Sequence, residues 1–195
     1  MENSKSSPDT RRSAFDWEEA ALRALASGGV HAVSIPQLAR ELGVTKGSFY
    51  WHFTSFEELL ERSLRRWEER DRDALKRLGA VADPRARLEA LFREAVDAPQ
   101  AHGLYIALSG SAVPRVSAAI RRVSQKRVAF LVGAYQELGF SGGDARRRAL
   151  LVYSAYIGLL HLRHEGSAMR TAAALDEYVA HAAESLIPKR RSRRS

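Results

Sequence analysis

The chain has 195 residues, of which 45% are hydrophobic and 28% charged, and it has no cysteine. The length suits one large or two small domains, and the composition is that of an ordinary globular protein. Without thiols there is no disulfide framework and no thiolate metal site. No apolar run reaches the ~18 residues that span a bilayer, and residues 1–10 lack an apolar signal region, so we expect a cytoplasmic protein with no membrane partner.

The net charge of +8 is unevenly distributed along the chain. Residues 1–60 hold six Lys or Arg and eight Asp or Glu, whereas residues 188–195 hold five basic residues and no acidic ones. The overall charge is therefore no evidence for nucleic-acid binding by the N-terminal part. The basic tail at 188–195 is compatible with a solvated end or with a contact to nucleic acid or an acidic membrane surface.

In chain order, the pattern predicts an all-α fold of about nine helices with no strand. Residues 1–10 are polar and are expected to form a disordered tail. Apolar periodicity, interrupted at glycines and prolines, predicts helices at 13–27, two short ones within 34–53, and further helices at 56–78, 85–96, 100–108, 115–138, 143–164 and 172–187.

Residues 34–53 have the pattern of a helix-turn-helix. Gly43 follows the last apolar position of the first short helix, where a left-handed C-cap favours glycine. Ser34 and Thr45 are placed to cap the two helices, and Ser55 with Glu58 forms a capping-box pattern before the next helix. Phe49 and Phe53, four residues apart, predict an inward face for the second helix.

The other face of the second helix carries groups that donate hydrogen bonds to phosphates or base edges. These residues are Thr45, Lys46, Gly47, Ser48, Tyr50, Trp51 and His52. The helix would lie in the DNA major groove, where Gly47 permits close approach. We expect Lys46 and Ser48 at base edges, and Thr45, Tyr50 and His52 at phosphates, supported by Ser34 and Gln37. The alternatives are a helical hairpin with an aromatic core, and a Tyr50 or Trp51 that packs on the domain.

The stretch resembles the DNA-binding signature of the tetracycline-repressor (TetR) family of bacterial transcriptional regulators. The resemblance covers about residues 13–62. It is carried by Ala20-Ala21-Leu22, Leu25, Gly29, Leu38-Ala39, Gly43-Val44-Thr45, Gly47, Phe49-Tyr50, His52-Phe53 and Glu57-Glu58-Leu59-Leu60. Phe56 departs from the pattern, because the family usually has a phosphate-binding lysine there.

The resemblance implies a helix-turn-helix domain at 11–55 and a regulatory and dimerisation domain at 56–187. Family members dimerise through their last two long helices, which predicts a homodimer on an inverted-repeat double-stranded DNA operator. The helix at 143–164 is nearly all apolar over 149–162 and so needs cover on every side. It is compatible with that dimer or with the core of a monomer.

Family members also bind small-molecule effectors in the C-terminal domain, and this loosens their hold on DNA. Candidate ligand contacts are aromatic or histidine side chains in the middle of the chain, although such residues are more often plain core. They are Trp67, Phe92, His102, Tyr105, Phe130, Tyr153 and Tyr156.

No catalytic motif, metal-binding motif or cofactor fingerprint occurs in the sequence. His161 and His164 have a spacing that can bind metal, but basic residues at a helix C-terminus also interact favourably with the helix dipole. The predicted function is a ligand-responsive, sequence-specific DNA-binding regulator that acts as a repressor. The alternative is a helical interaction protein whose helix-turn-helix is only a scaffold.

Overall fold

The computed structural model describes residues 12–97, 99–166 and 171–187, and the predicted tails at 1–10 and 188–195 lie outside the described residues. The described chain holds nine α-helices, one short 3₁₀ helix and no strand, which confirms the all-α prediction. The helices are α1 (Ala14–Gly28), the 3₁₀ helix η1 (Val30–Ala32), α2 (Ile35–Leu42), α3 (Lys46–Phe49), α4 (Phe56–Gly79), α5 (Pro84–Asp97), α6 (Pro99–Leu108), α7 (Pro114–Glu137), α8 (Gly142–His164) and α9 (Ala172–Leu186).

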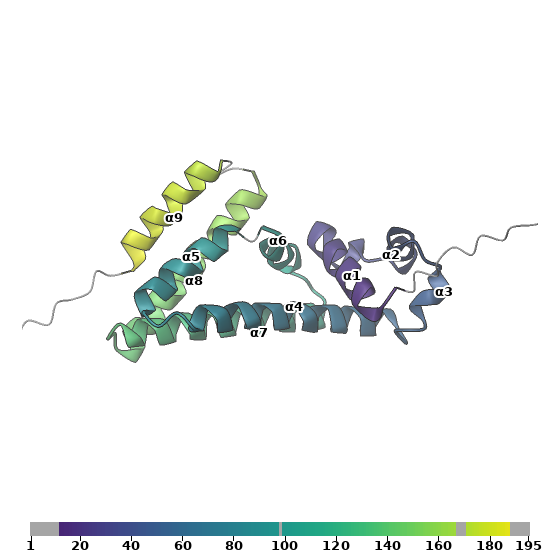
Figure 1. The fold of residues 1–195 in the computed structure, drawn as a ribbon, viewed down its shortest axis with the longest axis horizontal. Helices are drawn as coiled ribbons and strands as arrows, with labels where there is room; N and C mark the ends of the chain where they lie inside the picture. Colours follow the sequence, from purple (N-terminus) through teal and green to yellow (C-terminus); the bar gives the residue numbers. More distant parts are fainter. Residues whose placement is uncertain (1–11, 98, 167–170, 188–195) are drawn as a thin grey trace, which may run out of the picture.

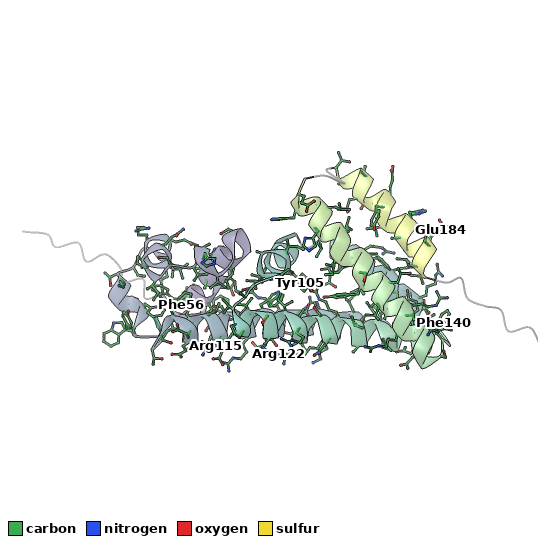
Figure 2. The ribbon with its side chains drawn as sticks, turned by 180° about the vertical axis from the view of Figure 1, so that it is seen from behind. Phe56, Tyr105, Arg115, Arg122, Phe140 and Glu184 are labelled. Carbon is green, nitrogen blue, oxygen red and sulfur yellow. The ribbon has the colours of Figure 1, made fainter. Side chains whose placement is uncertain are left out.

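Two long helices, α4 and α7, run side by side along the molecule (Figure 1). The helices α1–α3 lie at one end of this pair, α5, α8 and α9 lie toward the other, and α6 lies between the two groups. Phe56 and Arg115 mark the same end in Figure 2, and Phe140 marks the opposite end, so α4 and α7 point in the same direction. The pair therefore connects the N-terminal helices to the C-terminal ones.

The N-terminal helices pack around Trp17, which is fully buried. Its ring meets Phe49 edge-on at a centroid distance of 5.4 Å, and Phe49 stacks on Phe53 at 5.3 Å. Both phenylalanines are buried, as the four-residue spacing predicts. Ser13 and Asp16 form a reciprocal capping box that starts α1. The helix-turn-helix is therefore held from behind by an aromatic core.

Gly43 ends α2 in the left-handed conformation, with φ 70° and ψ 32°. A side chain at this position would meet the backbone strain that favours glycine in helix C-caps. The N–H of Val44 donates to the carbonyl of Ala39 at 2.9 Å, which closes the turn between α2 and α3. The sequence-based prediction of a glycine-capped turn is correct.

Three local predictions are wrong in detail. Ser34 and Thr45 occupy N-cap positions, but neither hydroxyl makes a capping hydrogen bond. Ser55 caps α4 by accepting from the N–H of Glu58 at 3.1 Å, yet the Glu58 carboxylate accepts from the N–H and hydroxyl of Thr54 instead of returning to Ser55. A carboxylate can satisfy two donors at once on Thr54, so the reciprocal bond moves by one residue.

The third correction concerns the length of α3. The expected helix extended to Phe53, but the α-helix ends at Phe49. Beyond it, Tyr50, Trp51 and His52 donate to carbonyls three residues earlier, which is the pattern of a 3₁₀ turn. Gly47 is a weak helix former near the start of α3. His52 is bonded to other segments at its end. Both features favour a 3₁₀ turn over a longer α-helix.

The C-terminal core joins α5, α7, α8 and α9. Tyr135 lies fully buried at its centre and donates its hydroxyl to the carbonyl of Leu186 at 2.8 Å. Burial raises the pKa of Tyr135 to about 12, so the phenol stays neutral and keeps its donor. This bond fastens the end of α9 to α7.

The helix α8 is covered on only part of its circumference. Val152, Leu159 and Leu160 are buried, whereas Leu150, Leu151 and Leu162 are 44%, 58% and 46% exposed. Within the described residues, no helix combines the length and the apolar character that a membrane crossing requires. Leu150 and Leu151 therefore leave apolar surface of α8 exposed in the single chain.

Candidate nucleic-acid interface and ligand pocket

The outer surface of α3 and the turn after it exposes large aromatic side chains. Tyr50 is 60% exposed and Trp51 is 82% exposed, while Thr45, Lys46 and Gly47 are also exposed. Tyrosine and tryptophan of this size are usually covered in a folded chain, and an exposed group of them marks a binding surface. The structure therefore brings most of the predicted DNA-contacting residues onto one open surface.

Two of the remaining predicted DNA contacts are less open. Ser48 and Ser34 are half-buried, and Gln37 is exposed on α2. The uncapped hydroxyls of Ser34 and Thr45 are left to bond with another molecule. Tyr50 lies edge-on to Phe49 at 5.1 Å, so its exposed ring is braced by the buried core. These five predicted contacts, Ser34, Gln37, Thr45, Ser48 and Tyr50, keep polar groups that suit a phosphate backbone or base edges.

His52 is tied into the chain. Its Nε2 lies 2.8 Å from the carbonyl oxygen of Arg12, and Arg12 Nε donates to the carbonyl of Leu42 at 2.9 Å. A carbonyl only accepts, so Nε2 carries the proton and Nδ1 of the neutral ring is an acceptor. His52 can therefore donate to a phosphate through Nδ1 only as an imidazolium. No local pattern indicates this link, because Arg12 and His52 are 40 residues apart in the sequence.

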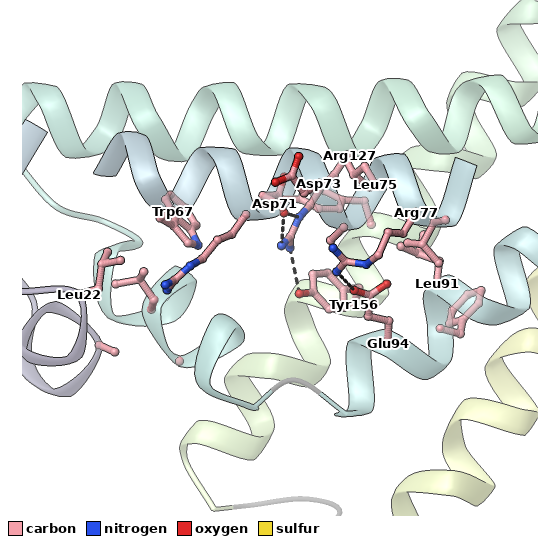
Figure 3. Close-up of a pocket in the computed structure, with 18 of the residues that line it drawn as sticks. Leu22, Trp67, Asp71, Asp73, Leu75, Arg77, Leu91, Glu94, Arg127 and Tyr156 are labelled. Carbon is pink, nitrogen blue, oxygen red and sulfur yellow. Dashed lines mark hydrogen bonds and ion pairs between the residues drawn. The ribbon is translucent and has the colours of Figure 1, made fainter. Parts of the chain in front are cut away.

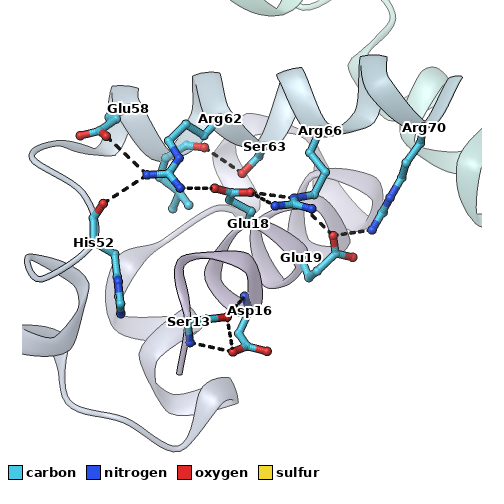
Figure 4. A network of polar contacts seen from close by, with 11 residues as sticks. Ser13, Asp16, Glu18, Glu19, His52, Glu58, Arg62, Ser63, Arg66 and Arg70 are labelled. Carbon is cyan, nitrogen blue, oxygen red and sulfur yellow. Dashed lines mark hydrogen bonds and ion pairs between the residues drawn. The ribbon is translucent and has the colours of Figure 1, made fainter. Parts of the chain in front are cut away.

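A group of paired charges holds α1 to α4 (Figure 4). Glu18 is buried, and its Oε1 lies 2.8 Å from Arg62 Nη2 while its Oε2 accepts from Arg66 Nε at 2.7 Å. Glu19 pairs with Arg66 and Arg70 through one oxygen, Oε1. We call these five residues the arginine clasp. It turns two acidic side chains of the N-terminal domain away from the exposed surface of α3.

Phe56 lies half-buried against the N-terminal core. An apolar ring in this place packs where the family pattern has a phosphate-binding lysine, and it offers no donor to DNA. The nearby Arg62 stacks over Phe53 at 4.8 Å and pairs with Glu18 and Glu58. Neither residue replaces the usual lysine in this arrangement.

A cavity of about 1150 Å³ opens between α1, α4, α5, α6, α7 and α8 (Figure 3). Four of the predicted ligand contacts line it, namely Trp67, Phe92, Tyr153 and Tyr156. Tyr105 and Phe130 are not among its lining residues, and the side chain of His102 lies outside the described residues. Leu22 and Arg23 of α1 belong to the wall, so the cavity reaches the N-terminal domain.

The polar part of the cavity wall was missed in the sequence. Arg127 donates through Nε to Oδ1 of Asp71 at 2.7 Å and through Nη1 to the hydroxyl of Tyr156 at 2.9 Å. Burial alone would lower the pKa of Arg127, but Tyr156 and Asp71 outweigh it, so the pKa of the guanidinium is raised. Asp71 and Arg127 are 56 residues apart, so their charges look like ordinary surface charges in the sequence.

Behind this pair, three hydroxyls form a network. Tyr105 and Ser124 lie 2.9 Å apart, and the Tyr153 hydroxyl lies 3.2 Å from that of Tyr105 and 3.0 Å from that of Ser124. Burial raises the pKa of Tyr153, which keeps the phenol neutral. Tyr105 thus supports a residue of the cavity wall without lining the cavity. His161 and His164 are exposed at the end of α8, and no cluster of three metal-ligating side chains occurs in the described residues.

Comparisons with known proteins agree with this geometry. Residues 19–62 match the family model described as bacterial regulatory proteins, tetR family. A comparison with curated proteins found no match.

Solved structures extend the likeness to the rest of the fold. A TetR transcriptional regulator from Legionella pneumophila is 16% identical with a TM-score of 0.73, and the match covers 95% of this chain and 100% of that one. A TetR-family regulator from Agrobacterium tumefaciens is 18% identical with a TM-score of 0.73, covering 92% and 98%. A protein of unknown function from Rhodococcus sp. RHA1 is 25% identical with a TM-score of 0.68, covering 93% and 97%. The family model thus covers the helix-turn-helix, and the solved structures show that the rest of the chain has the fold of TetR-family regulators.

Proposed function

We propose that the protein is a homodimeric repressor that binds an inverted-repeat operator and leaves it when a small molecule occupies the cavity. The observation that carries the DNA-binding part is the exposure of Tyr50 and Trp51 on a surface backed by a rigid aromatic core. In this proposal Lys46 and Ser48 contact base edges, and Thr45, Tyr50 and protonated His52 contact phosphates, with Ser34, Gln37, Gly47 and Trp51 alongside.

The dimer part is supported by the open face of α8. Leu150, Leu151 and Leu162 expose apolar surface on α8, and α9, which packs on α5, is the other outer helix at this end of the molecule (Figure 1). A two-fold pairing of this face would cover the leucines and present two copies of α3 to the DNA. Leu151→Glu should convert the dimer to a monomer, as measured by sedimentation equilibrium, while Leu175→Ala inside the fold tests for mere destabilisation.

The release part is supported by where the cavity lies. Its wall includes Leu22 and Arg23 of α1 as well as Trp67 and Asp71 of α4, so an occupant touches both sides of the arginine clasp. A ligand shifts a conformational equilibrium only through different contacts in the two states, and this site can supply them. A ligand in a cavity bounded by α7 and α8 alone would make no contact with α1 and could not act on its position directly.

The experiment that tests the DNA-binding part is selection from a random duplex pool followed by sequencing. We expect an enriched inverted repeat whose half-site spacing reports the separation of the two α3 helices. Tyr50→Ala should weaken binding to all duplexes about equally, whereas Lys46→Ala should also relax the base preference. The scaffold-only alternative predicts no enrichment at low salt and no effect of either variant.

A further inference from the structure

The carboxylate of Asp71 is only half satisfied. Oδ1 accepts from Nε of Arg127 at 2.7 Å and lies 2.6 Å from Nη2 of the same ion-paired guanidinium. Oδ2 is shielded from solvent and has no hydrogen-bond partner in the part of the chain that the structure describes. Buried carboxylate oxygens are almost always bonded, and an unbonded one is costly. Asp71 lines the cavity, so a turn of its carboxylate would let a donor on a bound molecule supply the missing bond.

The charged groups of the cavity wall are mostly paired with one another. Each arginine in its wall is paired with a carboxylate: Arg23 with Glu41, Arg70 with Glu19, Arg77 with Glu94, and Arg127 with Asp71. Asp73 also lines the cavity, and it has no ion-pair partner among the described residues. With the arginines occupied, the negative charge of Asp73 and the free oxygen of Asp71 favour a positively charged guest.

The rest of the wall is apolar and aromatic. Trp67 and Tyr156 lie on either side of the Asp71–Arg127 pair, and leucines and Phe92 continue the surface toward α5 (Figure 3). Aromatic faces attract cations, as Arg127 itself shows at 5.5 Å from the ring of Tyr156. A cavity of about 1150 Å³ also has room for a bulky apolar body.

We infer that the cavity selects bulky apolar molecules that carry one ammonium or amidinium group, with Asp71 as the residue that accepts its N–H. This inference deepens the proposed function and rests on its ligand site. The torsion about the Cβ–Cγ bond of aspartate is soft, so a turn of the carboxylate presents an oxygen to the guest while Arg127 keeps the other. An acidic guest would face Asp73 and would have to separate Arg127 from Asp71.

The test uses three probes that share a 4-(biphenyl-4-yl)butyl skeleton and end in an ammonium, a hydroxyl or a carboxylate. Binding to the full chain is measured by calorimetry without DNA. We expect the ammonium probe to bind on the order of tenfold tighter than the alcohol, as a charge-assisted bond requires, and the carboxylate to bind most weakly. In Asp71→Asn the tenfold preference should be lost and only about twofold or less should remain, which is the part that the charge of Asp73 supplies.

Two variants keep the test sharp. Glu68→Gln makes the same charge change one turn earlier on α4, at a residue that pairs with Arg122 outside the cavity, and should keep the ammonium preference. If Asp71→Asn fails to fold, Asp71→Leu with Arg127→Met removes both charges and should lose the preference with the fold intact. Equal binding of all three probes to the natural chain, tightest binding of the carboxylate, no binding of any probe, or a preference that survives at Asp71→Asn each overturns the inference.

The outcomes separate this inference from the proposed function, because the probes are tested without DNA. An Asp71-dependent ammonium preference without release from the selected operator would contradict the repressor mechanism and leave the ligand class standing. An operator that is bound and released by other compounds, with no ammonium preference, would contradict the ligand class alone.

Discussion

The long helix α4 takes part in two buried ion-pair sites that differ in how completely they are satisfied. At its N-terminal half, Glu18 of α1 uses both oxygens, one toward Arg62 and the other toward Arg66. At its C-terminal half, Asp71 uses one oxygen toward Arg127 of α7 and leaves the other unbonded among the described residues. The first site is closed by the chain itself, and the second is closed only if another molecule completes it.

The difference separates a structural contact from a binding contact made with the same chemistry. A buried carboxylate with two arginines gains charge-assisted bonds that offset its desolvation. A buried carboxylate with one unbonded oxygen carries part of that desolvation cost unrelieved, and here it borders a cavity. Substitutions at the two sites should therefore differ in how much stability they remove. They should also differ in whether a second substitution restores that stability.

The largest effect is expected for Arg127→Met. This change leaves Asp71 buried with no cation, and breaking a buried pair from one side costs about 3–5 kcal/mol. Removing both charges in Asp71→Leu with Arg127→Met should return the free energy of unfolding to within about 1 kcal/mol of the natural chain. Urea unfolding followed by circular dichroism measures all three. Equal losses in the single and double variants would show that packing, rather than the unpaired charge, dominates.

A smaller loss is expected for Glu18→Gln, about 2 kcal/mol in the free energy of unfolding. The arginines left behind are 35% and 26% exposed, so water takes over part of their solvation, in contrast to Arg127 at 15%. Because the clasp also orients α1 on α4, affinity for the selected operator should fall together with stability. A loss larger than that of Arg127→Met would reverse the ranking of the two sites.

A third effect appears only in acid and concerns the start of α4. The backbone N–H and hydroxyl of Thr54, each 2.7 Å from Oε2 of Glu58, lower the pKa of Glu58 below its ordinary value of 4.5. A carboxylate whose pKa is lowered by folding stabilises the fold above its unfolded pKa, and this contribution disappears as the pH falls through the folded pKa. Glu58→Gln should therefore flatten the loss of stability below about pH 4.5.

The acid experiment has an internal comparison in Asp16. Its pKa is also lowered, chiefly by the backbone N–H of Ser13 and then by the Ser13 hydroxyl, at the start of α1. Asp16→Asn should flatten the same acid limb, whereas the Glu18→Gln loss should already be present at pH 7. If Glu58→Gln lowered stability equally at pH 7 and pH 3, the proton linkage at this cap would be refuted.

The features that could be predicted from the sequence depend on residues close to one another in the chain. The left-handed Gly43, the inward Phe49 and Phe53, and the ends of the long helices all follow from residues within a few positions of one another. The arginine clasp and the Asp71–Arg127 pair could not be found this way, because their partners lie 44 to 56 residues apart. Charges on α4 look alike in the sequence, and only the packing of α1 and α7 decides which are buried.

The short α3 gives the same lesson for the DNA-binding surface. Helical periodicity correctly placed Phe49 and Phe53 inside, but it extended the α-helix through three residues that form a 3₁₀ turn. The tightening depends on His52, whose ring meets the Arg12 carbonyl and whose own carbonyl accepts from Arg62 at 3.4 Å. Contacts from both neighbouring segments thus shape the surface that carries Tyr50 and Trp51, and no local pattern encodes them.

The smallest effect is expected for Glu61→Gln, on the solvent side of α4. Glu61 lies 3.3 Å from Arg65, four residues on, with the two side chains 58% and 62% exposed. Water screens such a pair and both side chains lose rotamer freedom in making it, so its removal should change the free energy of unfolding by less than about 0.5 kcal/mol. Glu61→Gln removes the same charge from the same type of Glu–Arg ion pair as Glu18→Gln does. The main difference is that Glu18 is buried and Glu61 is exposed. If Glu61→Gln cost as much as Glu18→Gln, burial would not be what distinguishes the clasp, and the contrast between closed and open sites would lose its physical basis.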